Sequence, residues 1–197
     1  QREAVAQYAS IGLRAFADVE EALASELAMR DRERILTAQL VDTGLEARAH
    51  MSLGALALSQ GKRELADELL HRALELADQA KDDRTAGRAL ALVGKVARMG
   101  RQLELADQWC RAAVERSRAS GDRRDEGRAL VELASTLLAA QATDEAAEAA
   151  RQATELLAKR GDRRSLVHAF GTLAIIELDR GNFEDAEIAA ARAVELA

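Results

Sequence analysis

The sequence has no proline, one cysteine and few aromatic residues: one tryptophan, one tyrosine and three phenylalanines among 197 positions. Aromatic and β-branched residues favour strands, so their scarcity argues against a sheet protein, β-propellers included. One cysteine cannot form an intrachain disulfide, which excludes a disulfide scaffold. With 48% apolar residues, the chain is neither collagen-like nor disordered. These absences leave a helical protein.

The chain also lacks an excess of positive charge and a long apolar run. Its net charge is −6, which does not point to nucleic acid. No stretch reaches the ~18 uninterrupted apolar residues of a membrane helix, and no signal-peptide pattern opens the sequence. The first residue is Gln1 and the last residues stop inside a helical pattern, so we expect an excerpt of a longer protein. The lone thiol favours a reducing compartment, and we expect a cytoplasmic, bacterial protein outside any membrane.

Alanine is abundant, at 44 positions, and the sequence repeats itself with a period of 40. Similar strings occur at 61–67 (GKRELAD), 101–107 (RQLELAD), 141–147 (QATDEAA) and 181–187 (GNFEDAE). A fixed period of about 20–50 residues is typical of solenoids and propellers. Because alanine, leucine, glutamate and arginine are strong helix formers, this period predicts an α-solenoid.

Each 40-residue unit contains two amphipathic helical patterns. In 44–83 the first pattern covers about 44–59 and Gly61 interrupts it. The second covers about 63–80, with apolar residues three and four positions apart, and this stripe is wide enough to pack between two neighbours. Between units, glycine can supply a left-handed C-cap, and an aspartate such as Asp122 can cap the next helix. Each unit is therefore predicted to be a helical hairpin that needs its neighbours to bury its stripes.

Small residues recur at fixed positions of each hairpin, and a leucine or valine precedes the first member of each pair. The pairs are Gly54 and Ala66, Gly94 and Ala106, Ala134 and Ala146, and Ala174 and Ala186. This pattern resembles the tetratricopeptide repeat (TPR), in which the two helices of a hairpin approach closely at small residues. The period of 40 differs from the usual TPR period of about 34, and the proline that usually ends the second helix is missing.

The resemblance implies an all-α, right-handed α-α superhelix (a TPR solenoid) of about ten antiparallel helices in a single domain, 1–197. Regular repeats are expected at 44–83, 84–123, 124–163 and 164–197, after a degenerate repeat at 1–43. Repeats of this length are similar to those of kinesin light chains, of animal spindle-orientation scaffolds and of sensor regions in bacterial transcription regulators and signalling ATPases.

In TPR proteins the first helix of each hairpin lines a concave groove, so the resemblance implies a partner-binding surface there. Arg48, Arg88, Arg128 and His168 form a basic series at 40-residue intervals. The predicted groove residues are Arg48, Met51, Leu58, Arg88, Lys95, Arg98, Met99, Arg128, Val131, Ser135, Leu138, His168 and Ile175. A basic-rimmed apolar groove suits an acidic or amphipathic peptide. Alternatively, the arginines only pair with acids of the neighbouring unit, such as Asp83, Asp122 or Glu126.

No arrangement of residues predicts catalysis, a cofactor or a metal site. His50, His71 and His168 lie in three different units, without the i,i+4 spacing of a helical metal site. Cys110 occupies a position that is leucine or alanine in the other units, which predicts a buried, unreactive thiol. The sequence has no phosphate-binding loop and no nucleophile motif, and its carboxylates are interpreted as solvated helix surface. We therefore expect a protein that is not an enzyme.

Two functions are compatible with this pattern. The first is a protein–protein interaction scaffold that binds a peptide or protein segment in the groove. The alternative is an effector-sensing or self-associating TPR arm of a larger bacterial transcription regulator or signalling protein. Ile188 and Val194 are candidates for a homo-oligomeric contact, because the last unit leaves its apolar face open. The acidic net charge and the scarcity of groove aromatics argue against a nucleic-acid ligand.

Overall fold

The computed structural model describes residues 2–159 and 162–197, with the side chains of 2–24, 28, 33 and 37 outside the description. Within these ranges it contains eight helices and no strand, which confirms the all-α class. The helices are α1 (Arg2–Ser59), α2 (Arg63–Gln79), α3 (Asp83–Met99), α4 (Leu103–Ala119), α5 (Arg123–Ala139), α6 (Thr143–Ala158), α7 (Arg163–Asp179) and α8 (Phe183–Leu196). None of the described helices is long and apolar enough to cross a membrane.

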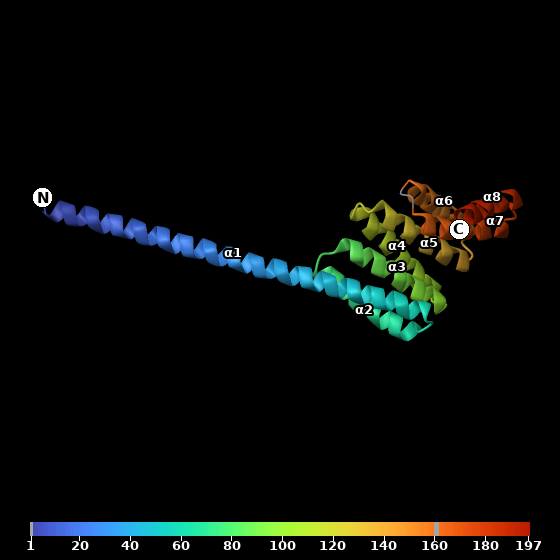
Figure 1. The fold of residues 1–197 in the computed structure, drawn as a ribbon, viewed down its shortest axis with the longest axis horizontal. Helices are drawn as coiled ribbons and strands as arrows, with labels where there is room; N and C mark the ends of the chain where they lie inside the picture. The colour runs from blue at the N-terminus through green and yellow to red at the C-terminus, as the bar shows by residue number, and fades with distance from the viewer. Residues whose placement is uncertain (1, 160–161) are drawn as a thin grey trace. The chain divides into compact units, whose positions relative to one another are not determined.

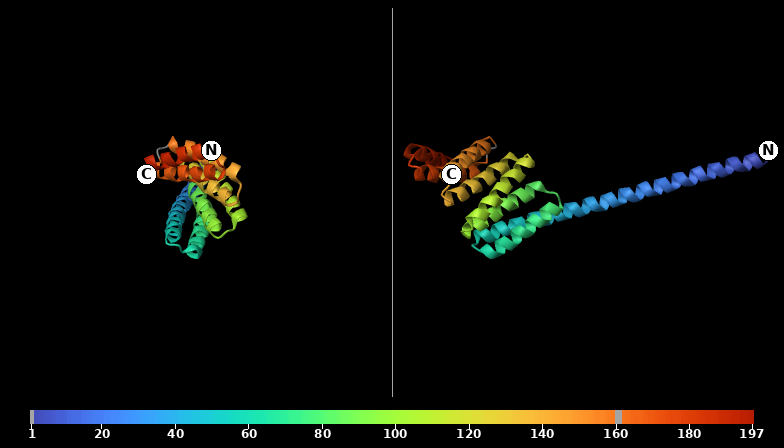
Figure 2. Two further views of the ribbon diagram at one scale, coloured as in Figure 1. Left: turned by 90° about the vertical axis from the view of Figure 1, so that its right-hand side faces the viewer. Right: turned by 180° about the vertical axis from the view of Figure 1, so that it is seen from behind.

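The chain divides into two compact units, Gln1–Asp42 and Thr43–Ala197. In the second unit consecutive helices pack against each other from α2 to α8, which forms a solenoid of antiparallel hairpins (Figure 1). The first helices of successive hairpins also touch, α3 against α5 and α5 against α7. Figure 2 shows the same stacking in chain order from two further directions.

The first 43 residues do not form the helical hairpin that the degenerate repeat predicted. Residues 2–43 belong to α1, which is helical from Arg2 to Ser59, so the described chain has eight helices and not about ten. The physical reason is the lack of any turn former, because residues 13–43 contain neither glycine nor proline. The weak match of this segment to the repeat pattern therefore reflects helix-forming residues and not a turn.

Small residues allow close contact between the two helices of a hairpin, as the repeat pattern predicted. A Cβ atom placed on Gly94 would lie 2.5 Å from Sγ of Cys110 and 3.3 Å from the backbone oxygen of Ala106. On Gly54 it would lie 2.7 Å from Cγ of Leu70. A side chain at either glycine would therefore push the hairpin apart.

The turns explain how the helices end without proline. Residues 61, 81, 101, 121, 141 and 181 all have a positive φ, and three of them are Lys81, Arg101 and Gln141. After all of these except 121, the next amide donates a hydrogen bond to the carbonyl five positions earlier, for example Asp82 to Ala77 at 2.9 Å. This Schellman-type closure satisfies the last carbonyls of the helix. Turns within and between hairpins therefore share the left-handed conformation.

Three aspartates at 40-residue intervals cap the first helices of the hairpins. The side chain of Asp82 accepts the amide of Thr85, that of Asp122 accepts the amides of Arg124 and Asp125, and that of Asp162 accepts the amide of Ser165. Such caps satisfy amides that have no partner inside the helix. The aspartates between the units therefore have the capping role that the sequence predicted.

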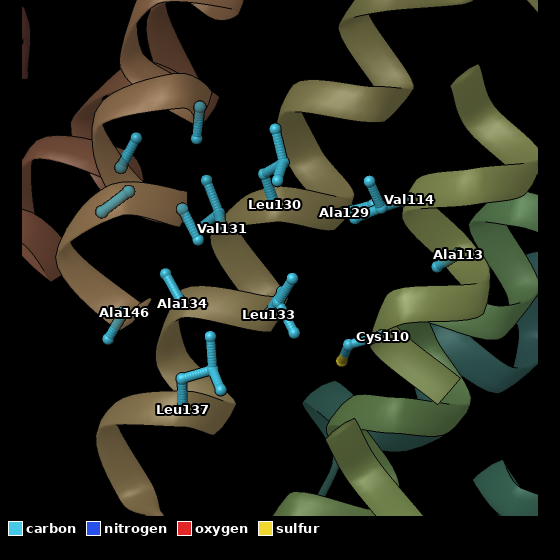
Figure 3. Packing of buried hydrophobic residues seen from close by; sticks show 14 of the residues in the cluster. Cys110, Ala113, Val114, Ala129, Leu130, Val131, Leu133, Ala134, Leu137 and Ala146 are labelled. Atoms are coloured by element: carbon cyan, nitrogen blue, oxygen red, sulfur yellow. The ribbon is translucent and has the colours of Figure 1, made fainter. Parts of the chain in front are cut away.

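The core of the solenoid lies between successive helices and consists mainly of alanine, leucine and valine. In Figure 3, α5 lies between α4 and α6: Leu133 points toward the helix that carries Cys110 and Val114, and Ala134 lies on the side of Ala146. Leu133 is 7% exposed and the other four are 7% exposed or less. The helices are thus buried against both neighbours, and the groove residues are positioned on a packed support.

Candidate functional site

A pocket of about 560 Å³ lies on the surface formed by the first helices of the hairpins. Its wall combines apolar side chains with charged ones from four consecutive first helices. The lining residues are Met51, Ser52 and Ala55 from α1, Arg88, Leu92 and Lys95 from α3, Asp125, Arg128, Val131 and Glu132 from α5, and Arg164, Ser165 and His168 from α7. The pocket thus spans the stacked repeats and does not belong to one of them.

The pocket contains only part of the predicted groove set. It brings together Met51, Arg88, Lys95, Arg128, Val131 and His168. The remaining predicted residues, Arg48, Leu58, Arg98, Met99, Ser135, Leu138 and Ile175, are not part of its lining. Two of these are well exposed elsewhere on the surface, Met99 at 47% and Ile175 at 55%.

Three charged lining residues were missed by the sequence reasoning. Arg164 belongs to a second series, Arg84, Arg124 and Arg164, at the same 40-residue interval, and this spacing could have revealed it. Asp125 and Glu132 line the pocket because they pair with cations of the preceding repeat. No feature of the sequence marks them, because isolated carboxylates on a helix are usually solvated.

Arginines and aspartates of neighbouring repeats form a continuous set of ion pairs beside the pocket. Arg128 reaches Asp162 of the next repeat at 2.7 Å, and Arg124 reaches the same carboxylate at 2.8 Å. One repeat earlier, Arg84 approaches Asp122 at 3.0 Å, and both Arg84 and Arg88 approach Asp125, at 3.3 and 3.8 Å. We call this set, Arg84, Arg88, Arg124 and Arg128 with Asp122, Asp125 and Asp162, the arginine–aspartate ladder.

The arginines of the basic series pair with acids of the neighbouring repeat, as the alternative interpretation predicted, but these acids are not the ones that were expected. Arg88 and Arg128 contact Asp125 and Asp162. Asp83 instead pairs with Arg116, and Glu126 pairs with Arg118 and Arg123. Asp122, the third acid expected, pairs with Arg84. The partners differ because the four arginines of the ladder point to the beginning of the next first helix.

A second pair of cations flanks the pocket on α3. Nζ of Lys95 lies 3.6 Å from Oε1 of Glu132, and Nη2 of Arg98 lies 3.1 Å from Oε2 of the same carboxylate. Glu132 is therefore shared by two positive groups of the preceding repeat, which leaves a net positive charge around it.

The accessible charge of the pocket is positive although the chain is acidic. Four cationic side chains line it, Arg88, Lys95, Arg128 and Arg164, against the two carboxylates of Asp125 and Glu132. The side chain of Asp125 is only 3% exposed, whereas that of Arg88 is 42% exposed and that of Arg128 is 37% exposed. Within the described ranges Arg164 makes no ion pair, so its charge is available to a ligand.

Four carboxylates are buried, which corrects the expectation that the acids form solvated surface. Asp125, Glu126, Asp162 and Glu177 are each 5% exposed or less, and every one is paired with arginine. A hydrogen bond from Arg124 lowers the pKa of Asp162 well below its ordinary value, although burial acts in the opposite direction. Burial alone would raise the pKa of Glu177, but hydrogen bonds from Asn182 and Arg151 outweigh it and lower that pKa. Asp162 and Glu177 thus keep their charge because neighbouring side chains donate hydrogen bonds to them.

The described residues contain no group of three or more side chains that could hold a metal ion. His168 is exposed at the edge of the pocket, and His50 and His71 each lie near one carboxylate of their own helix. Ile188 and Val194 on α8 are 55% and 77% exposed. Self-association through that face stays a prediction.

Cys110 is fully buried, as the sequence predicted, and its Sγ lies 3.6 Å from Oγ1 of Thr136. Burial raises the pKa of this thiol to about 11 from an ordinary 9.0. A buried, protonated thiol is a poor nucleophile.

We therefore expect an aromatic disulfide reagent at pH 8 to react with the folded chain about 100-fold more slowly than with the unfolded chain, because of the lower thiolate fraction alone. Release of the coloured thiolate, with and without denaturant, measures both rates. Equal rates would show that the thiol is accessible.

Stacked helical hairpins with small residues at each hairpin contact define a TPR-type helical repeat fold. The structure is similar to the crystal structure of BtubC (BKLC) from P. vanneervenii, with a TM-score of 0.67 and 17% identity over 85% of this chain and 72% of that one. It is also similar to the apo form of RapI, with a TM-score of 0.69 and 14% identity. That match covers 77% of this chain and 56% of RapI. No protein-family model and no curated protein matches the sequence.

Proposed function

We propose that the unit Thr43–Ala197 is a protein-interaction module that binds an acidic, partly apolar segment of a partner protein. The observation that carries this proposal is the excess of accessible positive charge in a pocket shared by four first helices of an otherwise acidic chain. Met51, Leu92 and Val131 supply apolar surface beside these charges. The similarity to solved TPR-type structures supports a groove-binding mode, in which an extended or helical segment lies across several repeats.

Lys95 and Arg164 are the best sites for testing this proposal without damage to the fold. Removing Lys95 leaves Glu132 paired with Arg98, and Arg164 makes no ion pair within the described ranges. Arg128, in contrast, contacts the buried Asp162, so its removal would weaken both binding and folding. The double variant Lys95→Ala with Arg164→Ala therefore isolates the contribution of the pocket charge.

We expect a fluorescein-labelled Glu-Leu repeat peptide to bind the unmodified chain more tightly than a Lys-Leu repeat peptide of equal length. The variant K95A/R164A should weaken binding of the Glu-Leu peptide about tenfold, because two exposed ion pairs are lost. Fluorescence anisotropy at low and physiological salt measures both affinities, and added salt should weaken binding of the unmodified chain more than that of the variant.

The variant R72A/R192A is a matched control, because it removes the same charge from the second helices α2 and α8. Arg72 and Arg192 are exposed and each pairs with a glutamate of its own helix. The affinity of this control variant for the Glu-Leu peptide should stay within about twofold of that of the unmodified chain. Equal loss in both double variants, or no preference for the acidic peptide, would show that the pocket does not recognise negative charge.

A further inference from the structure

The part of α1 that lies in the unit Thr43–Ala197 has an exposed apolar stripe. Its residues lie four, four and three positions apart and so share one face of the helix: Leu45, Ala49, Leu53 and Leu56. The three leucines are between 51% and 55% exposed, and Ala49 is exposed as well. We call these four residues the open face. A helix normally buries such a stripe against a neighbour, and none of the four is among the described residues that line the pocket.

The equivalent positions of later first helices are buried under the second helix of the preceding hairpin. On α3, 40 positions later, they are Thr85, Ala89, Val93 and Val96, each 5% exposed or less. On α5, after another 40 positions, they are Asp125, Ala129, Leu133 and Thr136, each 7% exposed or less. The helix α2 packs against α3, and α4 packs against α5. Residues 2–42 instead continue α1, so the open face is one half of a contact between repeats.

The contact between α4 and α5 shows how a helix covers this face (Figure 3). Sγ of Cys110 lies 3.6 Å from Oγ1 of Thr136. Nε of Arg118, in the last turn of α4, lies 2.9 Å from Oε1 of Glu126. Between these two contacts the numbering rises along α4 and falls along α5, so the helices run antiparallel. None of the buried residues of α4 is larger than valine: Ala106, Cys110, Ala113, Val114 and Ser117.

A glutamate beside the open face gives the charge that a covering helix must carry. Glu46 has the same position in its repeat as Glu126, which is buried and pairs with Arg118 and Arg123. The side chain of Glu46 is 54% exposed, and within the described ranges it forms an ion pair with His50 at 3.8 Å. A covering helix would remove Glu46 from water and must therefore supply a cation. The helix α8 of a second copy has no basic residue in its last turn, so the charge argues for a different occupant.

We propose that an amphipathic helix of a partner protein docks on the open face, antiparallel to α1. The partner helix places small apolar residues against Ala49, Leu53 and Leu56, and an arginine or lysine in its last turn pairs with Glu46. Apolar residues three and four positions apart are the usual anchors when a helix binds in this way. The open face and the pocket have no residue in common, so this docking does not depend on the proposed binding of an acidic segment.

The probe for this docking is a fluorescein-labelled peptide of residues 102–120, because it contains α4 and so has the required pattern. Cys110→Ala prevents its oxidation, and a lactam bridge from Arg111→Lys to Glu115, on its exposed side, keeps it helical, which circular dichroism verifies. Fluorescence anisotropy should show that the peptide binds the full chain. The variant L53E/L56E should weaken this binding about 100-fold, because two carboxylates would be buried in an apolar contact. Both leucines are exposed in the free chain, so the variant still folds.

An exchange of charges tests the register of the docked helix. Glu46→Arg in the chain and Arg118→Glu in the peptide should each weaken binding about tenfold, because like charges then meet. The two changes together should restore the affinity to within about threefold of the original. If the reversed pair does not recover the affinity, the proposed register is wrong and the proposal fails.

The variant I188E/V194E is the matched control, because it introduces the same two acids at exposed residues of α8. This control and the pocket variant K95A/R164A should both leave the affinity for the peptide within about twofold of that of the unmodified chain. Sedimentation equilibrium tests for a second copy as the occupant: any self-association of the chain should be unaffected by L53E/L56E. Self-association that L53E/L56E removes, a helical peptide that does not bind, or equal binding to the unmodified chain and L53E/L56E would each overturn the proposal.

Discussion

The substitution Gly94→Ala is expected to lower the free energy of unfolding by about 2–3 kcal/mol, although alanine is the better helix former. The added Cβ would lie 2.5 Å from Sγ of Cys110, closer than van der Waals contact. Two further neighbours at 3.3 Å are backbone atoms, the oxygen of Ala106 and the nitrogen of Cys110. Backbone atoms of a packed helix cannot move aside alone, so α3 and α4 must separate. Urea unfolding followed by circular dichroism measures the change.

A second glycine of a first helix provides the matched control. Gly171 lies inside α7, and a Cβ on it would meet no atom within 4 Å. Gly171→Ala should therefore raise the free energy of unfolding by about 0.5–1 kcal/mol through helix propensity alone. If Gly94→Ala stabilised the chain by a similar amount, the close approach of α3 and α4 would be wrong. In a chain that already carries Cys110→Ala, which removes the nearest atom, Gly94→Ala should lower the free energy of unfolding by less.

The substitution Asp162→Ala is expected to lower the free energy of unfolding by about 3 kcal/mol, because it removes a helix cap and two charged hydrogen bonds. The carboxylate of Asp162 accepts hydrogen bonds from Ser165 at the beginning of α7. It also binds Arg124 and Arg128 of the preceding repeat, at 2.8 and 2.7 Å. Both arginines are partly exposed, so water can solvate them after the change, and this limits the loss.

Asp82→Ala separates the two contributions. Asp82 caps α3 through Thr85 in the same way, but the described residues give it no ion pair with an arginine. Its removal should cost about 1 kcal/mol, the usual value for a lost cap. The excess cost of Asp162→Ala over Asp82→Ala measures the contribution of the ladder at that junction. Equal costs would mean that the arginines contribute nothing to stability.

The stabilisation by Asp162 should also depend on pH with a definite sign. Its pKa in the folded chain lies below the ordinary value of 3.8, so the folded state binds fewer protons than the unfolded state in this range. The stabilisation is then complete above about pH 5 and decreases as the pH falls toward the folded pKa. At pH 3 the difference in stability between the unmodified chain and D162A should be smaller than at pH 7 by about 1 kcal/mol. An increase in this difference at low pH would contradict the assignment.

The hairpins could be predicted from the sequence because glycine and alanine stand at positions that few other residue types can occupy. Close packing of two helices requires a small residue at Gly54, Gly94 and Ala134. A positive φ favours glycine at Gly61 and Gly121. The partial match of residues 1–43 to the repeat pattern predicted a turn, whereas the absence of glycine and proline in 13–43 favours the continuous helix α1. Absence of a turn former is itself a strong helix signal.

The pocket was harder to predict than the fold. Arg88 and Arg128 of the basic series line the pocket, but the position of their ion-pair partners depends on the stacking of one hairpin on the next. Asp125 looks like a surface residue in a hydropathy pattern, and only packing against the neighbouring repeat buries its side chain. The spacing of residues within one repeat therefore does not predict which side chains of neighbouring repeats form ion pairs.

The turns have a consequence for how such an array can grow. In the six turns with a positive φ that the structure describes, a left-handed residue follows first and second helices alike, whereas the small residues and the arginines repeat only with every hairpin. The sign of φ does not distinguish the inner from the outer helices, and side chains alone decide which helix faces the groove. A duplication of a single helix with its turn would keep every turn intact and yet place outer side chains in the groove. Only duplications of whole hairpins extend the binding surface.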